Sequence, residues 1–274
     1  MRIFVFGHKG MLGRYVYTYL SKFFEVIGID RNTIDASTIS ENELHNKLIE
    51  LGVSSNDVVI NCIGAIKPRV DSLGDLNAIQ VNSVFPRILA NCCENLNSNL
   101  IHPTTDCVFS GKKGNYTEND NFDVYDVYGM TKSLGEPKNC TIIRTSIIGE
   151  EVNQGRSLVE WVKSQKNQSV FGYTNHLWNG MTCLQFSKIC RQIIDENLFW
   201  RGVCHIYSNT VNKKELVELI SEIYELNIIV NPKETDVNCD RTLSSVKDYS
   251  KIFDVPNLKE QIIEMKNYTS LFTK

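Results

Sequence analysis

Residues 2–13, Arg-Ile-Phe-Val-Phe-Gly-His-Lys-Gly-Met-Leu-Gly, predict a buried strand, a glycine-rich turn and the start of a helix. In such a unit Gly7 permits the tight turn, Gly10 lets the backbone approach a pyrophosphate, and Gly13 lets the helix pack against the strand. We expect the helix over residues 14–23, and its unpaired N–H groups and dipole would attract a diphosphate. The spacing is G-x-x-G-x-x-G rather than G-x-G-x-x-G, but the order of strand, turn and helix still indicates a dinucleotide-binding unit.

Strand-like and helix-like segments then alternate over the first half of the chain. The pattern predicts helices at 41–51 and 76–96, with a kink or an early break at Pro86, and strands at 25–29, 57–62, 99–102 and 141–144. Repeated units of this length predict a parallel sheet with right-handed crossovers. The predicted fold is therefore α/β, a Rossmann-type doubly wound sheet.

Beyond about residue 150 the alternation loosens, and the stretch 170–180 reads as irregular. Helices are predicted at 157–163, 184–194, 213–224 and 258–268, and a strand at 203–207. We expect a dinucleotide-binding domain over residues 1–150. Residues 151–274 are expected to form mainly a smaller substrate-binding lobe, with segments that return to the first domain.

Composition excludes several classes of protein. The net charge of −3 and the lack of a basic stripe argue against nucleic-acid binding, and no apolar run is long enough to span a bilayer. Met1 leads straight into the first strand, so we expect no signal peptide and a cytoplasmic location. The nine cysteines contain no C-x-x-C and the five histidines no H-x-x-x-H. Reduced, buried thiols are expected, and no metal site is predicted.

Tyr128 and Lys132 are a candidate catalytic pair in the run Val127-Tyr-Gly-Met-Thr-Lys132. Residues four apart on a helix share a face, so the ammonium and the phenol would lie side by side. A neighbouring cation stabilises a phenolate and lowers the phenol pKa from its usual value of about 10. The sequence therefore predicts a tyrosine that can donate a proton near neutral pH.

Other polar residues follow the predicted strands at the edge where doubly wound sheets bind ligands. Asp30 could accept hydrogen bonds from a ribose and favour NADH, whereas Arg31 could meet a 2′-phosphate and favour NADPH. Both cofactors stay open at this point. The residues expected to bind the cofactor are Gly7, Lys9, Gly10, Met11, Leu12, Gly13, Asp30, Arg31, Cys62, Ile63, Gly64, Tyr128 and Lys132.

Three motifs together resemble those of the extended short-chain dehydrogenase/reductase family. They are Gly7-x-x-Gly10-x-x-Gly13, Thr104-Thr-Asp-Cys-Val-Phe109 and Tyr128-Gly-Met-Thr-Lys132. More narrowly, they are similar to those of the dTDP-4-dehydrorhamnose reductase branch, in which an Arg-Thr-Ser segment follows, as Arg144-Thr-Ser146 does here. The resemblance covers roughly residues 1–150 well and is thinner over the last third of the chain.

The resemblance implies a reaction and a role for each motif residue. Thr105 would hydrogen-bond a substrate carbonyl oxygen, Tyr128 would protonate it, and Lys132 would hold the nicotinamide ribose. NADPH or NADH would reduce the 4-keto group of a nucleotide-activated 6-deoxyhexulose. From the residues alone, Asp106 could orient a catalytic water or a substrate hydroxyl, or cap the following turn. Further substrate contacts are expected from Thr104, Cys107, Trp178 and Arg241. Relatives are often dimers, so a homodimer is one of the oligomeric states that stay open.

Cys107 separates this chain from the related sugar-nucleotide dehydratases. They carry a glutamate at that position, and a thiol with a pKa of about 8.5 is a poor substitute for a carboxylic acid. Three functions stay open. The first is a simple reductase, and the second is an epimerase or epimerase-reductase that uses Cys107 and His176. The third is a non-catalytic regulatory subunit, like that of a methionine-adenosyl enzyme.

Overall fold

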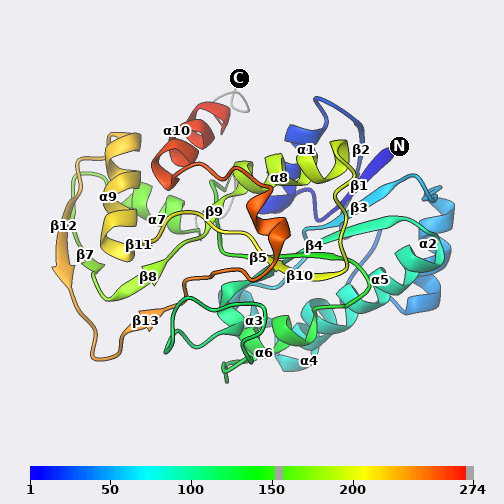
Figure 1. Ribbon diagram of the computed structural model, residues 1–274, viewed down its shortest axis with the longest axis horizontal. Helices are drawn as coiled ribbons and strands as arrows, with labels where there is room; N and C mark the ends of the chain where they lie inside the picture. The colour runs from blue at the N-terminus through cyan, green and yellow to red at the C-terminus, as the bar shows by residue number, and fades with distance from the viewer. Residues whose placement is uncertain (152–156, 270–274) are drawn as a thin grey trace.

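The centre of the protein is a six-stranded parallel sheet (Figure 1). The structure is a computed structural model that describes residues 1–151 and 157–269. Strand order is β10-β5-β4-β3-β1-β2, and every neighbouring pair is parallel, which confirms the predicted α/β doubly wound fold. The strands are β1 (Arg2–Phe6), β2 (Glu25–Ile29), β3 (Val58–Asn61), β4 (Asn99–Thr105), β5 (Thr141–Thr145) and β10 (Gly202–His205).

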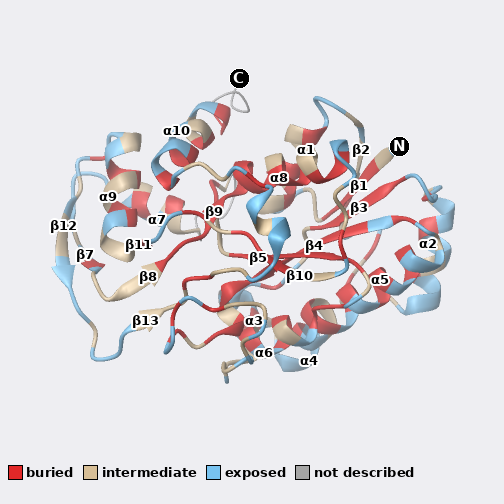
Figure 2. Cartoon of the chain, in the orientation of Figure 1, coloured by how far each residue is buried: buried red, intermediate tan, exposed pale blue. Residues whose placement is uncertain are grey.

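Helices cover both faces of this sheet. On one face α1 (Met11–Leu20) and α8 (Cys183–Asp195) pack on each other above Ile3 and Val5. On the other face lie α2 (Glu41–Glu50), α5 (Phe85–Asn95) and α6 (Val127–Leu134), and a second apolar cluster forms around Phe4 and Phe6. Alternate residues of β1 thus feed opposite cores. Figure 2 shows the buried strands between helices whose outer faces are exposed.

A smaller lobe lies at one end of the sheet (left in Figure 1). Its helices are α7 (Leu158–Ser164), α9 (Lys213–Tyr224) and α10 (Leu258–Thr269), which enclose a third apolar cluster. Three small sheets complete the lobe. They pair β7 (Ser169–Tyr173) with β12 (Ile229–Lys233), β6 (Ile147–Ile148) with β9 (Met181–Thr182), and β8 (His176–Trp178) with both β11 (Val211–Asn212) and β13 (Cys239–Asp240). The domain boundary near residue 150 stays a prediction.

Several predicted segments differ from the observed ones. The first helix starts at Met11 instead of residue 14, because Gly10 takes an extended conformation and serves as its N-cap. The predicted helix 76–96 is divided into α4 (Asp75–Ile79), a π-helical turn at Gln80–Val84 and α5. Pro86 lies in the first turn of α5, where a missing N–H costs little.

Two further differences concern elements that were missed. Helix α3 (Lys67–Leu73) was not predicted. The stretch 170–180 is not irregular, since it holds most of β7 and all of β8. Their side chains do not alternate cleanly between apolar and polar, which hides short strands from pattern analysis. Within the described residues, none of the helices has the length and apolar character that crossing a membrane requires.

Candidate functional site

Two adjoining cavities open at the carboxyl ends of the central strands. The first, of about 500 Å³, reaches from the glycine turn to Thr105, Tyr128 and Lys132. The second, of about 720 Å³, reaches from the same turn to Asp30 and Arg31. Their shared lining is Lys9, Gly10, Cys62, Ile63, Gly64, Ala65 and Arg69. Ligands of doubly wound sheets bind at this edge.

The glycine turn has the backbone that its sequence predicts. Gly7 has a φ of +74°, a conformation that other residues rarely adopt. A Cβ on Gly13 would lie 2.2 Å from the carbonyl oxygen of Gly7, so only glycine lets α1 pack this closely. Gly10 caps α1 without a side-chain hydrogen bond. Met11 and Leu12, in the first turn of α1, line the first cavity. The turn therefore offers backbone N–H groups to an anion.

The two opposing cofactor signals, Asp30 and Arg31, both lie at the second cavity. Lys9 Nζ donates to Asp30 Oδ2 at 2.5 Å, and this hydrogen bond lowers the pKa of Asp30 to about 2. Arg31 Nε donates to Asp35 Oδ2 at 2.9 Å. Each charge thus has an internal partner. The contact of either residue with a cofactor stays a prediction.

Thr105, Tyr128 and Lys132 converge on the first cavity from two elements. Thr105 is the last residue of β4, while Tyr128 and Lys132 lie on α6. The Asp126 side chain accepts from the Gly129 N–H at 2.9 Å and so fixes the start of α6. A Cβ on Gly64 would lie 3.7 Å from Lys132 Nζ, which places the amine at the exit of β3.

Burial controls the electrostatics of this group. It raises the pKa of the Tyr128 phenol, although a hydrogen bond with the Thr105 side chain acts in the opposite direction. It also lowers the pKa of Lys132 to about 8. The expectation of a lowered Tyr128 pKa is therefore wrong. Removing the phenolate or the ammonium from water costs more free energy than the attraction between the two charges recovers.

Thr104, Asp106 and Cys107 lie beside Thr105. Asp106 is buried, and its Oδ1 accepts from Thr105 Oγ1 at 3.1 Å. Cys107 Sγ lies 3.6 Å from the same oxygen, and burial raises the pKa of the thiol to about 12. Thr104 Oγ1 is buried without a hydrogen-bond partner among the described residues. Thr104, Thr105 and Cys107 all line the first cavity.

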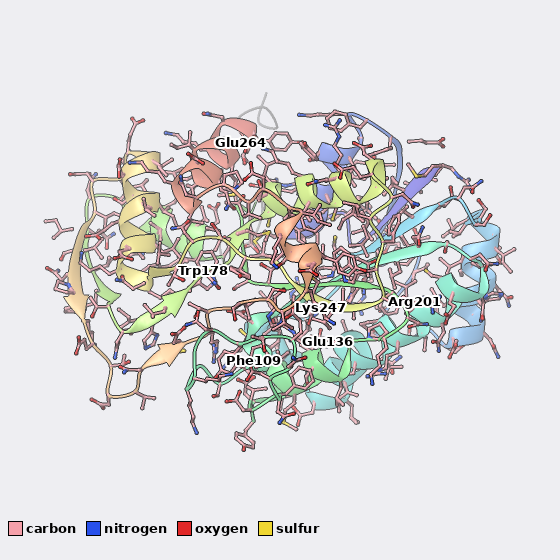
Figure 3. The ribbon with its side chains drawn as sticks, viewed as in Figure 1. Phe109, Glu136, Trp178, Arg201, Lys247 and Glu264 are labelled. Atoms are coloured by element: carbon pink, nitrogen blue, oxygen red, sulfur yellow. The ribbon has the colours of Figure 1, made fainter. Side chains whose placement is uncertain are left out.

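Arg241 and Trp178 come from the lobe and take different positions. The Arg241 Nε donates to the Phe109 carbonyl oxygen at 3.0 Å, and Nη1 lies 3.9 Å from Cys107 Sγ. Trp178, labelled in Figure 3, is only 4% exposed, belongs to the third apolar cluster and lines neither cavity. Packing explains its position. Its contact with substrate stays a prediction.

Several cavity residues were missed from the sequence. Arg69 lies on α3, the helix that the sequence pattern did not reveal, and it lines both cavities. Asn61 ends β3 and lines the first cavity. Asn82, from the π-helical turn, bonds the N–H and C=O of Ala65 at 2.8 and 3.0 Å and fixes the exit of β3. A polar residue that ends a buried strand was the available signal for Asn61.

Comparison with known proteins gives a consistent picture. A family model described as "RmlD substrate binding domain" matches residues 1–178. A dTDP-4-dehydrorhamnose reductase of Mycolicibacterium smegmatis is 32% identical over 140 residues, which are 49% of this chain and 40% of that protein. The chain spans about half the length or less of the curated reductases it matches. Methionine adenosyltransferase 2 subunit beta of Danio rerio is 28% identical over 243 residues, covering 82% of this chain and 74% of that one.

Solved structures share the fold over nearly the whole chain. A dTDP-4-dehydrorhamnose reductase of Clostridium acetobutylicum superposes with a TM-score of 0.80 at 21% identity, covering 98% of this chain and 100% of the other. The Bacillus anthracis protein of the same name, solved in complex with NADP, gives 0.81 at 17% identity, covering 98% and 99%.

Proposed function

The chain belongs to the family of the RmlD substrate-binding domain, and from this premise we propose that it is an NAD(P)H-dependent reductase. Its proposed substrate is the 4-keto group of a nucleotide-activated 6-deoxyhexulose. The observation that supports this most is the meeting of Thr105, Tyr128 and Lys132 in one cavity beside the glycine turn. The names of the matched reductases agree with it.

A nicotinamide dinucleotide fits the residues around the two cavities. The glycine turn, the start of α1 and the exit of β3 form a cradle that side chains larger than glycine would obstruct. Gly10 and Gly64 would take the pyrophosphate and the middle of the cofactor, and Asp30 or Arg31 the adenosine ribose. When bound, the cofactor supplies a hydride. NADPH and NADH both stay open, since Lys9 neutralises Asp30 and Asp35 pairs with Arg31.

The chain's own groups supply the proton and the electrostatic stabilisation. A carbonyl that accepts a hydride gains negative charge on oxygen, so donors aimed at that oxygen lower the barrier. Thr105 and Tyr128 hydroxyls provide two such donors. Because burial raises the pKa of Tyr128, the phenol keeps its proton at neutral pH and acts as the acid in the direction of reduction. Lys132 then stabilises the phenolate that remains.

Two alternatives are less well supported. The Cys107 thiol, with its pKa raised to about 12, is poorly suited to removing protons from a sugar during epimerisation. His176, its expected partner, bonds Thr235 Oγ1 at 2.8 Å and stacks on Tyr173. The similarity to a methionine adenosyltransferase subunit favours a binding role. A pure binder, however, has no need for the converging Thr105, Tyr128 and Lys132.

Turnover of Tyr128→Phe tests the proposal. The wild-type protein should oxidise NADPH or NADH only when a dTDP- or UDP-linked 4-keto-6-deoxy sugar is present. Removing the phenol hydroxyl should lower kcat by about 10²- to 10⁴-fold, as expected for loss of a general acid. Tyr125→Phe is a matched control, because Tyr125 is 87% exposed just before α6. Unchanged turnover in the Tyr128 variant, or no turnover on any keto-sugar nucleotide, would contradict the proposal.

A further inference from the structure

Two loops that are far apart in the sequence join the lobe to the central sheet. The first loop, residues 109–118, comes shortly after β4. The second loop, residues 240–246, begins at the end of β13 and leaves the lobe towards β10 (Figure 1). Tyr116 and Leu243 form a parallel bridge and pack with Phe109 in one small apolar cluster. The two loops therefore lie side by side.

Glu118, at the end of the first loop, binds both the second loop and β10. Its Oε1 accepts from Ser245 Oγ at 2.6 Å and from the backbone N–H of His205 at 2.7 Å. Its Oε2 accepts from the backbone N–H of Val246 at 3.0 Å. Burial raises the pKa of Glu118, but these hydrogen bonds outweigh burial and lower the pKa overall. The side chain is therefore a carboxylate at neutral pH, and both of its oxygens accept hydrogen bonds.

Asp120, two residues further along, makes local contacts instead. Its Oδ2 accepts from the Thr117 N–H at 2.7 Å and from Thr117 Oγ1 at 3.0 Å, and its Oδ1 pairs with Lys113. These contacts fold residues 113–120 onto themselves. The contacts of Glu118 have a different consequence, because they fix the second loop against the first.

The second loop carries Arg241 to the edge of the first cavity. Arg241 Nε donates to the Phe109 carbonyl oxygen at 3.0 Å, and Nη1 lies 3.9 Å from Sγ of the cavity residue Cys107. The catalytic side of this contact is held separately. The Cys107 N–H donates to Thr105 Oγ1 at 3.1 Å, and α6 packs against the Cys107 carbonyl oxygen at Gly129. A shift of the second loop would therefore change the gap between the lobe and Cys107 without moving Thr105.

We propose that Glu118 is a positioning residue that sets how closely the lobe approaches the first cavity, and thereby the affinity for the sugar nucleotide. The inference rests on the proposed function, which places the substrate carbonyl at Thr105 and the rest of the substrate towards the lobe. Glu118 lines neither cavity, so it acts through the second loop. A glutamine in its place offers one acceptor oxygen and an NH₂ group that would face a donor. At least one of the hydrogen bonds that Glu118 accepts is then lost.

Steady-state kinetics of Glu118→Gln separate this role from catalysis. The KM for the 4-keto sugar nucleotide should rise roughly tenfold, the effect of about one lost hydrogen bond to a charged group. The kcat should stay within about twofold, because the contact supports substrate and transition state equally. Asp120→Asn is the matched control, since it removes a carboxylate from the same region; it should be less stable but keep the wild-type KM. Ser245→Ala should raise KM less, and it should add little to Glu118→Gln because both changes affect one contact.

Calorimetric titration of the NADP⁺-loaded protein with dTDP-glucose and UDP-glucose measures the same effect without turnover. The Kd of the sugar nucleotide should rise in Glu118→Gln by the same factor as KM, and an unchanged NADP⁺ affinity shows that the variant is folded. A wild type that binds a sugar nucleotide but reduces no keto sugar would refute the reductase, while the Kd of the variant would still decide the role of Glu118. An unchanged Kd in Glu118→Gln would overturn the proposal, as would an equal rise in Asp120→Asn or a wild type that binds neither sugar nucleotide.

Discussion

At the scale of single residues, burial of the Lys132 amine weakens the fold. Its side chain is buried, with the residue 7% exposed, and no ion pair of Lys132 occurs in the part of the chain that the structure describes. Burial of the ammonium lowers its pKa to about 8. A charge kept out of water without a partner destabilises the folded state, so its retention points to a role with a ligand.

We therefore expect Lys132→Met to be more stable and inactive. At pH 7 the free energy of unfolding should rise by about 1–3 kcal/mol, because the cost of a buried ammonium is removed. For the wild type, stability should increase from pH 8 towards 10, since the unfolded chain binds more protons in that window. The advantage of the variant should then shrink. Urea unfolding at several pH values measures this, and a less stable variant at pH 7 would contradict it.

The sequence predicted which residues line the two cavities better than it predicted the energetics of those residues. Spacing alone placed Tyr128 beside Lys132 and the glycines at the turn, because both depend on local geometry. It gave the wrong direction for the Tyr128 pKa, because burial depends on neighbours distant in sequence.

At the scale of elements, α6 packs closely against the segment after β4, and this contact positions Tyr128 relative to Thr105. A Cβ on Gly129 would lie 2.4 Å from the Cys107 carbonyl oxygen. Gly129→Ala would ordinarily favour a helix by about 1 kcal/mol, but overpacking against backbone costs about 1–3 kcal/mol and should win. The variant should move Tyr128 away from Thr105 and lower kcat at least about tenfold, as misplacement of a reacting group does.

Steady-state kinetics with saturating cofactor measure the Gly129→Ala effect. Met130→Ala is the control, because Met130 is 48% exposed on the same helix. Its kcat should match the wild type. A Gly129 variant with normal kcat would show that α6 can shift without harm to the site.

Elements with strong local sequence patterns were predicted well. Elements that depend on contacts with residues far along the chain were not. β1 and β2 match their predicted limits because each is a short, mostly apolar run bounded by turns, which leaves little choice. β8 and β13 have only 3 and 2 residues, and they exist because each pairs with strands far along the chain. The π-helical turn at Gln80–Val84 likewise serves a tertiary contact, through Asn82.

At the scale of the whole molecule, one buried polar network joins the sheet, α6 and two long loops. Arg144 of β5 bonds Glu136, just beyond α6, at 3.0 Å and His205 of β10 at 2.7 Å. His205 Nδ1 lies 2.7 Å from the Ser244 carbonyl oxygen and so donates to it. Phe109 and Glu136 in Figure 3 mark this region. Accepting from Arg144 requires an unprotonated His205 Nε2.

This network predicts loss of stability in mild acid. Burial, and then the charge of Arg144, lower the pKa of His205, while burial also lowers that of His102. Between about pH 6.5 and 5 the unfolded chain, with ordinary histidine pKa values, binds more protons than the folded one, so stability must fall as pH falls. Each buried histidine adds up to about 1.4 kcal/mol per pH unit to that slope. In His205→Gln this position no longer titrates, so the difference in bound protons between the unfolded and the folded chain should fall by close to one. Above pH 7 the stability curves of the variant and the wild type should run parallel. Unfolding free energies measured in urea across this pH range test the prediction. An unchanged pH slope in the variant would mean that His205 is protonated in the folded protein.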